Sequence, residues 1–196
     1  MGRASKSEQR QHRQSIVDIA ARQVKARGIE GLTIPDVMAA AGLTPGGFYG
    51  HFASKAELSA QAVTRAFDIQ SDALRAISDR SPGGHPAAMS ALVDFYFSDV
   101  HRTDLERSCP MAALSADVAR ERDESPARYA FIDGIERNLS QVASLGDGED
   151  DSVSEEQREE ALVAIATAVG AIVMARATAG RPISDEIVAA VRRVLP

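Results

Sequence analysis

The sequence of 196 residues contains a single cysteine, Cys109, and lacks the short motifs that mark common enzyme and metal sites. One cysteine excludes an intrachain disulfide, and it suits a reducing, intracellular compartment. No H-E-x-x-H, C-x-x-C or G-x-S-x-G pattern occurs, and the four histidines are scattered. The sequence therefore predicts no enzyme activity, no bound metal and no cofactor.

Long apolar runs and strand-like alternation are also missing. The longest apolar run, residues 161–175, is shorter than a membrane span, so we expect a buried helix there. Residues 1–14 are polar and basic with no apolar segment behind them, which argues against a secretory signal. Apolar residues recur instead at the i, i+3, i+4 spacing of amphipathic helices. We predict a cytoplasmic, all-α protein of about nine helices without a membrane partner.

The net charge of −6 is unevenly distributed along the chain. Residues 1–60 carry a net charge of +3, and the remaining 136 residues carry −9. A basic first third on an acidic body suggests that only the N-terminal part meets a polyanion. A solvated helix face is the alternative explanation of the same charges.

Capping and helix-breaking residues indicate where the helices begin and end. Thr33 and Thr44 are natural N-caps with a proline soon after each, and Ser54 opens a capping box with Glu57. Loop formers at residues 81–86 give the clearest break, and residues 146–156 are predicted as an exposed loop. The predicted helices are 8–27, 33–41, 44–51, 54–79, 88–101, one beginning at 109–110, 125–146, 154–179 and 184–195.

The stretch GLTPGGFYGHF, residues 42–52, concentrates glycine in a way that favours close approach to phosphate. Gly42 and Gly47 have the spacing of P-loop glycines, but Phe48 replaces the required lysine and no strand precedes them. Two short helices joined by a turn at Gly42, with a longer helix on either side, instead match a helix-turn-helix.

In the helix-turn-helix interpretation, the free N–H groups of Gly46 and Gly47 behind Thr44 can receive a phosphate or a base edge. Tyr49 and His51 can donate hydrogen bonds to phosphate.

Lys55 adds a positive charge nearby, while Phe48 and Phe52 anchor the segment in a small core. A glycine-weakened surface turn would explain the caps but not the Tyr-x-His-x-x-x-Lys spacing.

Residues from about 10 to 70 resemble the TetR family of bacterial transcriptional regulators. The sequence GIEGLTIPDVMAAAGLTPGGFYGHFASKAEL, residues 28–58, follows the family pattern G-x-x-x-T-x-x-x-I/V-A-x-x-A-G-V-S/T-x-G-x-x-Y-x-H-F-x-x-K-x-x-L. It departs at Met38 and Ala39, which replace an I/V-A pair, and at Gly50, where the family often has a larger side chain. The candidate DNA contacts on this resemblance are Thr33, Thr44, Pro45, Gly46, Gly47, Tyr49, His51 and Lys55.

The resemblance implies a DNA-binding domain at 1–53 with its helix-turn-helix at 33–52, a connecting helix at 54–80, and an effector-binding and dimerisation domain at 81–196. The last two helices carry more apolar surface than a peripheral hairpin needs, and a two-fold four-helix interface is implied. A monomeric bundle core is the alternative. The candidate interface residues are Val169, Ile172, Val173, Ile187 and Val191.

The middle helices offer a candidate pocket for an apolar or aromatic small molecule. Tyr96 and His101, five residues apart near the end of one predicted helix, are its best candidates, although plain core packing explains each equally simply. Cys109 precedes a proline at a helix start near Arg107, so a lowered thiol pKa and a sensing role are alternatives to an inert buried cysteine. The candidate pocket residues are Phe95, Tyr96, His101, Cys109, Met111 and Phe131.

Together these features predict a homodimeric transcriptional repressor that binds an inverted-repeat operator and releases it when a small effector binds. A thiol-based regulator acting through Cys109 is one alternative. A helical module that binds protein rather than DNA is another, but it leaves the basic arm of Arg3, Lys6, Arg10 and Arg13 without a partner.

Overall fold

The computed structural model describes residues 6–147 and 153–195, and within these ranges every regular element is helical. The all-α prediction is therefore confirmed. The elements are α1 (Lys6–Arg27), α2 (Ile34–Ala40), the 3-10 helix η1 (Pro45–Gly50), α3 (Lys55–Asp79), α4 (Gly84–Tyr96), α5 (Asp99–Thr103), the 3-10 helix η2 (Leu105–Arg107), α6 (Pro110–Val118), α7 (Pro126–Ala143), α8 (Glu155–Ala177) and α9 (Pro182–Arg192).

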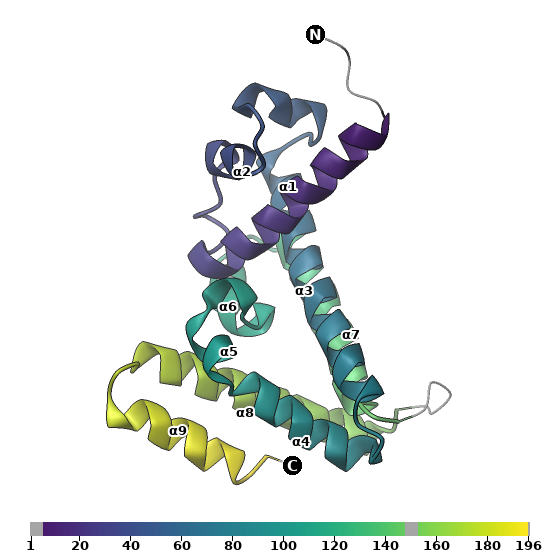
Figure 1. Cartoon of the computed structure of the whole chain (residues 1–196), viewed down its shortest axis with the longest axis vertical. Coiled ribbons are helices and arrows are strands. Elements are labelled where there is room, and N and C mark those ends of the chain that lie inside the picture. The colour runs from purple at the N-terminus through teal and green to yellow at the C-terminus, as the bar shows by residue number, and fades with distance from the viewer. Residues whose placement is uncertain (1–5, 148–152, 196) are drawn as a thin grey trace.

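The helices form a small head at one end of the molecule and a larger body at the other (Figure 1). The head consists of α1, α2 and η1, together with the first turns of α3. The rest of α3 runs away from the head alongside α7, and α8 packs against both α7 and α9 in the body. Because α3 belongs to both parts, it joins the head to the body without a loop.

The head owes its fold to a compact apolar core under η1. Ile16 and Val24 on α1, Val37 on α2, and Phe48 and Phe52 around η1 are all buried in one cluster. Glycines at both ends of α2 redirect the chain, and Gly42 does so with a φ of 70° that other residues rarely adopt. The core therefore holds η1 in place while leaving its outer side uncovered.

Local capping fixes the start of the longer helices as predicted. The Ser54 hydroxyl accepts a hydrogen bond from the Glu57 amide at 3.1 Å at the start of α3. Ser154 and Gln157 form a reciprocal capping box at the start of α8, with distances of 2.9 and 3.1 Å. Side chains thus satisfy amide groups that the first turn leaves unpaired.

Three predictions about the bounds or the type of a helix were wrong in detail. The helix expected at 88–101 is divided, because α4 ends at Tyr96 and Ser98 caps the separate α5. Helix α4 also begins at Gly84, inside the predicted loop. The helix expected at 44–51 is the 3-10 helix η1 rather than an α-helix. The loop predicted at 146–156 lies partly outside the described residues.

Helix α8 is long and apolar enough to cross a membrane by length and composition alone. Core helices of soluble proteins meet the same criterion. Its Ala161, Ala164, Ala171, Ile172 and Ala175 are buried within the body, but Leu162, Val163, Val173 and Met174 are exposed, so the helix expected to be buried is buried on one side only.

Candidate nucleic-acid interface

The segment from Thr44 to His51 presents backbone rather than large side chains at the end of the head. Thr44 caps η1 through its carbonyl, which accepts from the Gly47 amide at 3.0 Å, and its hydroxyl makes no capping hydrogen bond. The free N–H expected at Gly47 was therefore wrong, because η1 itself uses that amide. Added Cβ atoms at Gly46 or Gly50 would meet nothing within 4 Å. The surface around η1 is therefore open to another molecule.

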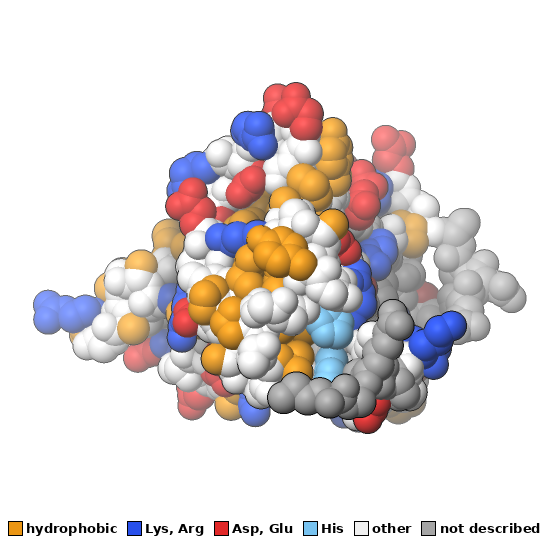
Figure 2. Space-filling view, turned by 90° about the horizontal axis from the view of Figure 1, so that it is seen from above, with side chains coloured by type: hydrophobic (Ala, Val, Ile, Leu, Met, Phe, Trp, Pro, Cys, Tyr) orange, Lys and Arg blue, Asp and Glu red, His pale blue; other side chains and the backbone are white. Residues whose placement is uncertain are grey.

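Tyr49 projects from this surface while its neighbours point inward. Its side chain is 74% exposed, whereas the adjacent Phe48 is fully buried and stacks on Phe52 with a centroid distance of 5.5 Å. Figure 2 looks onto this end of the molecule, where uncharged and hydrophobic surface occupies the centre and histidine side chains lie beside it. Phe48 and Tyr49 thus lie on opposite sides of the same short helix, so that one anchors it and the other is exposed.

Arg13 on α1 locks the far end of η1 to α3. Its guanidinium donates to Glu57 at 2.9 Å and to the backbone carbonyl of His51, and it lies 4.3 Å from the centre of the Phe52 ring. Hydrogen bonds from Arg13 and from the Ala53 amide lower the pKa of Glu57. These contacts make Arg13 a structural residue of the head, although the sequence suggested it as part of a basic arm.

The remaining basic arm is helical where it is described. Lys6 and Arg10 lie on the exposed start of α1, and Arg3 falls outside the described residues.

The other candidate DNA contacts border the same end of the head. Thr33 is exposed, but its hydroxyl already accepts from the Asp36 amide at 3.3 Å and so caps α2. Lys55 is exposed, and its Nζ donates to the Glu30 carbonyl at 3.3 Å. The ring of His51 lies 6.2 Å from that of His12, and partial burial, with smaller effects of His12 and Arg13, lowers its pKa. His51 is therefore placed as a neutral donor.

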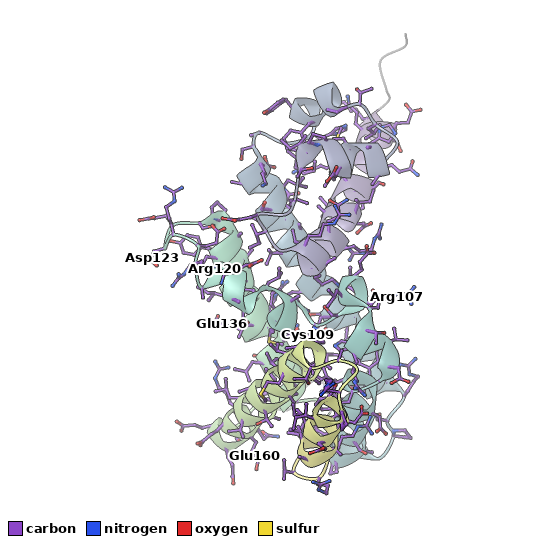
Figure 3. The ribbon with its side chains drawn as sticks, turned by 90° about the vertical axis from the view of Figure 1, so that its left-hand side faces the viewer. Arg107, Cys109, Arg120, Asp123, Glu136 and Glu160 are labelled. Carbon is purple, nitrogen blue, oxygen red and sulfur yellow. The ribbon has the colours of Figure 1, made fainter. Side chains whose placement is uncertain are left out.

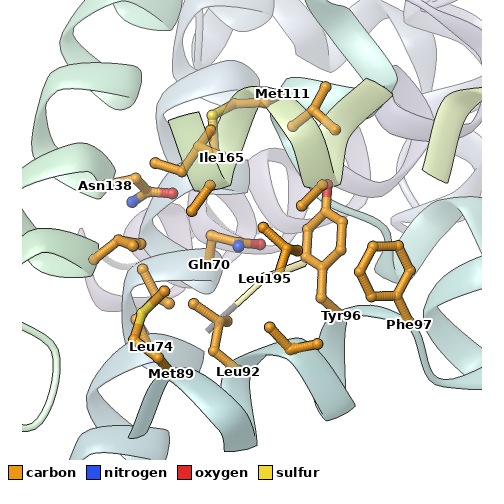
Figure 4. A pocket seen from close by; sticks show the side chains of 15 residues that line it. Gln70, Leu74, Met89, Leu92, Tyr96, Phe97, Met111, Asn138, Ile165 and Leu195 are labelled. Atoms are coloured by element: carbon orange, nitrogen blue, oxygen red, sulfur yellow. The ribbon is translucent and has the colours of Figure 1, made fainter. Parts of the chain in front are cut away.

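The body contains an apolar cavity between α3, α4, α7 and α8, with Leu195 from the end of the chain at its wall (Figure 4). Of the six predicted pocket residues, Tyr96 and Met111 line it. Phe95 is partly exposed on α4 and does not line the cavity, and neither do His101, Cys109 and Phe131. Tyr96 and His101 also lie on separate helices, so their expected arrangement on one helix was wrong.

Two polar residues of this cavity were missed by sequence reasoning. Gln70 on α3 and Asn138 on α7 are buried and line its wall. The available signal was the position of Asn138 on the apolar side of α7, seven residues after Phe131 and four before Val142. A polar residue on an apolar stripe needs a partner, and this one lies beside a cavity.

Cys109 is fully buried where the head meets the body (Figure 3). Its amide donates to Nε2 of His101 at 3.2 Å, and the hydroxyl of Tyr96 lies beside its thiol. Burial raises the pKa of the thiol, so the lowered pKa expected from the helix start and Arg107 was wrong. The desolvation of a sealed site outweighs the nearby positive charge of Arg176.

Burial, with smaller effects of nearby positive charges, keeps His101 neutral beside Cys109. Burial, followed by the effects of Arg176 and Lys25, lowers the pKa of His101 to about 4. Arg176 donates to the His101 carbonyl at 2.6 Å, and Lys25 comes from α1 of the head. The cluster is therefore a packed junction between the two parts of the molecule.

A second contact at the junction fixes the end of α1. The carboxylate of Asp117 on α6 accepts from the Ile29 amide at 3.1 Å. Gly28, just before it, has a φ of 79°, and an added Cβ there would lie 2.2 Å from the same carboxylate. The turn after α1 is thus tied directly to the body.

The candidate dimer residues divide between the inside and the outside of the body. Ile172 is fully buried in the protomer's own core, so its predicted place at the interface was wrong, whereas Val169 is partly buried and lines the cavity. Ile187 and Val191 are partly buried against that core, while Val173 is exposed. Besides Val173, the exposed large apolar residues on α8, on α9 and just after α9 are ones outside the predicted interface set: Leu162, Val163, Met174, Ile183 and Val194.

Comparison with known proteins agrees with this geometry. Residues 16–62 match the family described as bacterial regulatory proteins, tetR family. The chain is 28% identical over 169 residues to an uncharacterized HTH-type transcriptional regulator of Mycobacterium tuberculosis, found in strains CDC 1551 / Oshkosh and ATCC 25618 / H37Rv, with 84% of each chain covered.

Solved structures of similar fold cover nearly the whole chain. A transcriptional regulator of the TetR family from Cytophaga hutchinsonii has a TM-score of 0.75 at 20% identity, covering 97% of this chain and 96% of that one. The reduced form of Escherichia coli NemR has a TM-score of 0.74 at 19% identity, covering 95% and 97%. The fold of head and body together is therefore shared with these proteins.

Proposed function

Because the chain belongs to the TetR family of bacterial regulatory proteins and is a DNA-binding transcriptional regulator, we propose that it is a cytoplasmic repressor that binds an inverted-repeat operator as a homodimer. In this proposal η1 enters the major groove, and Tyr49 and Lys55 contact phosphates on either side of it.

The exposed Tyr49 between two buried phenylalanines is the observation that carries this proposal. A phenol held outward on an anchored 3-10 helix can donate to a phosphate without losing much side-chain freedom on binding. The open glycines beside it allow the backbone amides to approach the duplex closely. The hydroxyl of Thr44, which makes no capping bond, supplies a further polar group on the same surface.

Dimerisation through the outer surface of α8 and α9 would place two heads on the two halves of an inverted-repeat operator. Met174 is 52% exposed and lies on the same apolar side of α8 as Val163 and Val173. At Gly170, between them, an added Cβ would meet nothing within 4 Å, so a second helix could approach closely there. Regulators of this family bind DNA as dimers, and two linked heads raise the affinity of a small reading surface.

A small-molecule effector completes the proposal. An effector weakens operator binding only if it binds one arrangement of head and body better than the other. Helix α3 lines the cavity of the body, and its first turns belong to the head. In this proposal, a molecule bound in the cavity therefore changes the position of the head through α3.

Selection of random duplex DNA by the purified protein tests the proposal directly. We expect enrichment of an inverted repeat whose affinity, followed by fluorescence anisotropy, falls steeply as salt rises. Weak and equal binding to every duplex would instead favour the protein-interaction alternative.

The oligomeric state has its own test. Met174→Glu places a charge on the proposed interface, and sedimentation should show a monomer for this variant and a dimer for the wild type. The matched variant Asp133→Asn changes charge at an exposed position of α7, outside the proposed interface, and should remain dimeric. A wild-type monomer that still selects an inverted repeat would contradict the proposed interface.

A further inference from the structure

The cavity of the body is small and its wall carries no charge. Its volume is about 40 Å³, room for only a few waters, and none of its fifteen lining residues is charged. Methionines 89 and 111 and the terminal Leu195 form part of the wall. These flexible side chains can move aside for a larger guest. A charged ligand would lose its hydration there without gaining a counter-ion.

Asn138 presents an unpaired acceptor in this apolar wall. Its side chain is 0% exposed, and its Nδ2 donates to Ser71 Oγ at 3.0 Å and to Gln141 Oε1 at 3.3 Å. The amide nitrogen of Asn138 faces Ser71 and Gln141, and its Oδ1 atom is directed elsewhere. Oδ1 has no hydrogen-bond partner among the described residues. Figure 4 shows this oxygen pointing into the ring of side chains around the cavity.

The ring of Tyr96 lines the cavity on the side opposite Asn138 (Figure 4), and its hydroxyl lies beside the thiol of Cys109. Its hydroxyl is buried and lacks a conventional hydrogen-bond partner within the described chain. The Cys109 thiol beside it is only a weak partner. Burial raises the pKa of Tyr96 well above its ordinary value, so the hydroxyl stays neutral and can donate or accept.

We propose that this cavity binds an uncharged, mainly apolar molecule with a hydrogen-bond donor, and that the donor is received by Oδ1 of Asn138. The inference rests on the proposed function, since it names the chemical class of the effector. A buried carbonyl without a partner destabilises the empty protein, and a donor in the ligand removes that penalty. The site therefore discriminates against apolar molecules of equal shape that lack a donor.

Three probes that differ in one group test the class of ligand. The probes are 4-propylphenol, 4-propylanisole, in which a methyl ether replaces the donor, and the anion 4-propylbenzoate. By titration calorimetry at neutral pH, we expect the phenol to bind roughly tenfold more tightly than the anisole, and the benzoate not to bind. Equal binding of phenol and anisole, tight binding of benzoate, or no binding of the phenol would each overturn the proposal.

Substitutions then locate the acceptor. Asn138→Leu keeps a similar volume and removes the carbonyl, so the preference for phenol over anisole should disappear. Gln141→Ala removes a neighbouring partner of Asn138 but leaves Oδ1 in place, and the preference should remain. If Asn138→Leu does not fold, the carboxamide NMR signals of wild-type Asn138 decide: they should shift with phenol and not with anisole.

Operator binding separates this inference from the function on which it rests. Phenol that binds preferentially but leaves the selected operator bound would uphold the cavity's selectivity and contradict effector control. Release of operator by phenol and anisole at equal occupancies, with no difference in affinity, would uphold effector control and reject the role of Asn138.

Discussion

The head and the body place their polar side chains in opposite ways. In the head, the core under η1 is built from apolar side chains, and the groups proposed to meet DNA lie outside it, with Tyr49 as the clearest example. In the body, His101, Asn138 and Tyr96 are buried, and two of them border a cavity. A surface for a large charged partner therefore needs only a firm support, whereas a site for a small neutral partner needs polar groups kept away from water.

Removing the support of the head should have the largest effect. Phe48→Ala deletes a fully buried ring that stacks on Phe52. We expect the free energy of unfolding to fall by about 3–5 kcal/mol, measured by urea denaturation followed by circular dichroism. Tyr49→Ala changes the adjacent exposed position and should cost far less. Similar losses for both variants would mean that the head is not organised around Phe48.

Acid should act on the body through its buried histidine. The pKa of His101 is about 4 in the folded protein against 6.5 for an ordinary histidine, so the unfolded chain takes up the proton first. Stability from this group is present above pH 6.5 and is lost as pH falls toward 4, by roughly 3 kcal/mol. Thermal unfolding at several pH values measures the slope of stability against pH. His101→Gln should flatten it, and an unchanged slope would assign the acid sensitivity elsewhere.

The packing of α3 on α7 should tolerate no added atom at Gly134. An added Cβ would lie 2.3 Å from the Phe67 ring, so Gly134→Ala should reduce the free energy of unfolding by roughly 1–3 kcal/mol. Asp133→Ala, at the exposed neighbouring position, should change it by less than about 0.5 kcal/mol. Chemical denaturation of both variants compares them. Equal stability would show that Phe67 moves aside freely.

The variant with the smallest effect on stability should have a clear effect on DNA binding. Tyr49→Phe removes one exposed hydroxyl, so unfolding should be nearly unchanged, while operator affinity should fall roughly tenfold or more. Tyr129→Phe makes the same change at an exposed tyrosine of α7 in the body and should alter neither quantity. Anisotropy and thermal unfolding report the two readouts. Equal DNA affinity for the wild type and both variants would remove Tyr49 from the interface.

The head was predictable from sequence because its signals are local. Gly42, Pro45 and the Thr33 cap each act within a few residues of where they stand, and the short helices beside them begin and end close to the predicted positions. The break after Tyr96 was missed because no glycine or proline marks it, although Ser98 caps the next helix. A serine at this position, which can cap a new helix, was the available signal in the sequence.

The interior of the body depends on distant contacts that the sequence does not reveal. Helix α8 is apolar on several sides, so its periodicity could not tell that Ile172 faces inward while Val173 faces outward. The raised pKa of Cys109 likewise comes from burial by several helices rather than from its neighbours in the chain. Asn138 acquires its unpaired carbonyl only when α3 and α7 pack together.

The continuity of α3 gives the molecule a mechanical property. Its 25 residues form a rod roughly 37 Å long, with Lys55 at one end and the cavity residues Gln70 and Leu74 beyond its midpoint. A rotation of roughly 5° about the end in the body displaces the other end by roughly 3 Å, about the length of one hydrogen bond. Leverage along a single helix thus converts a small rearrangement of side chains into a movement as large as the contacts that hold DNA.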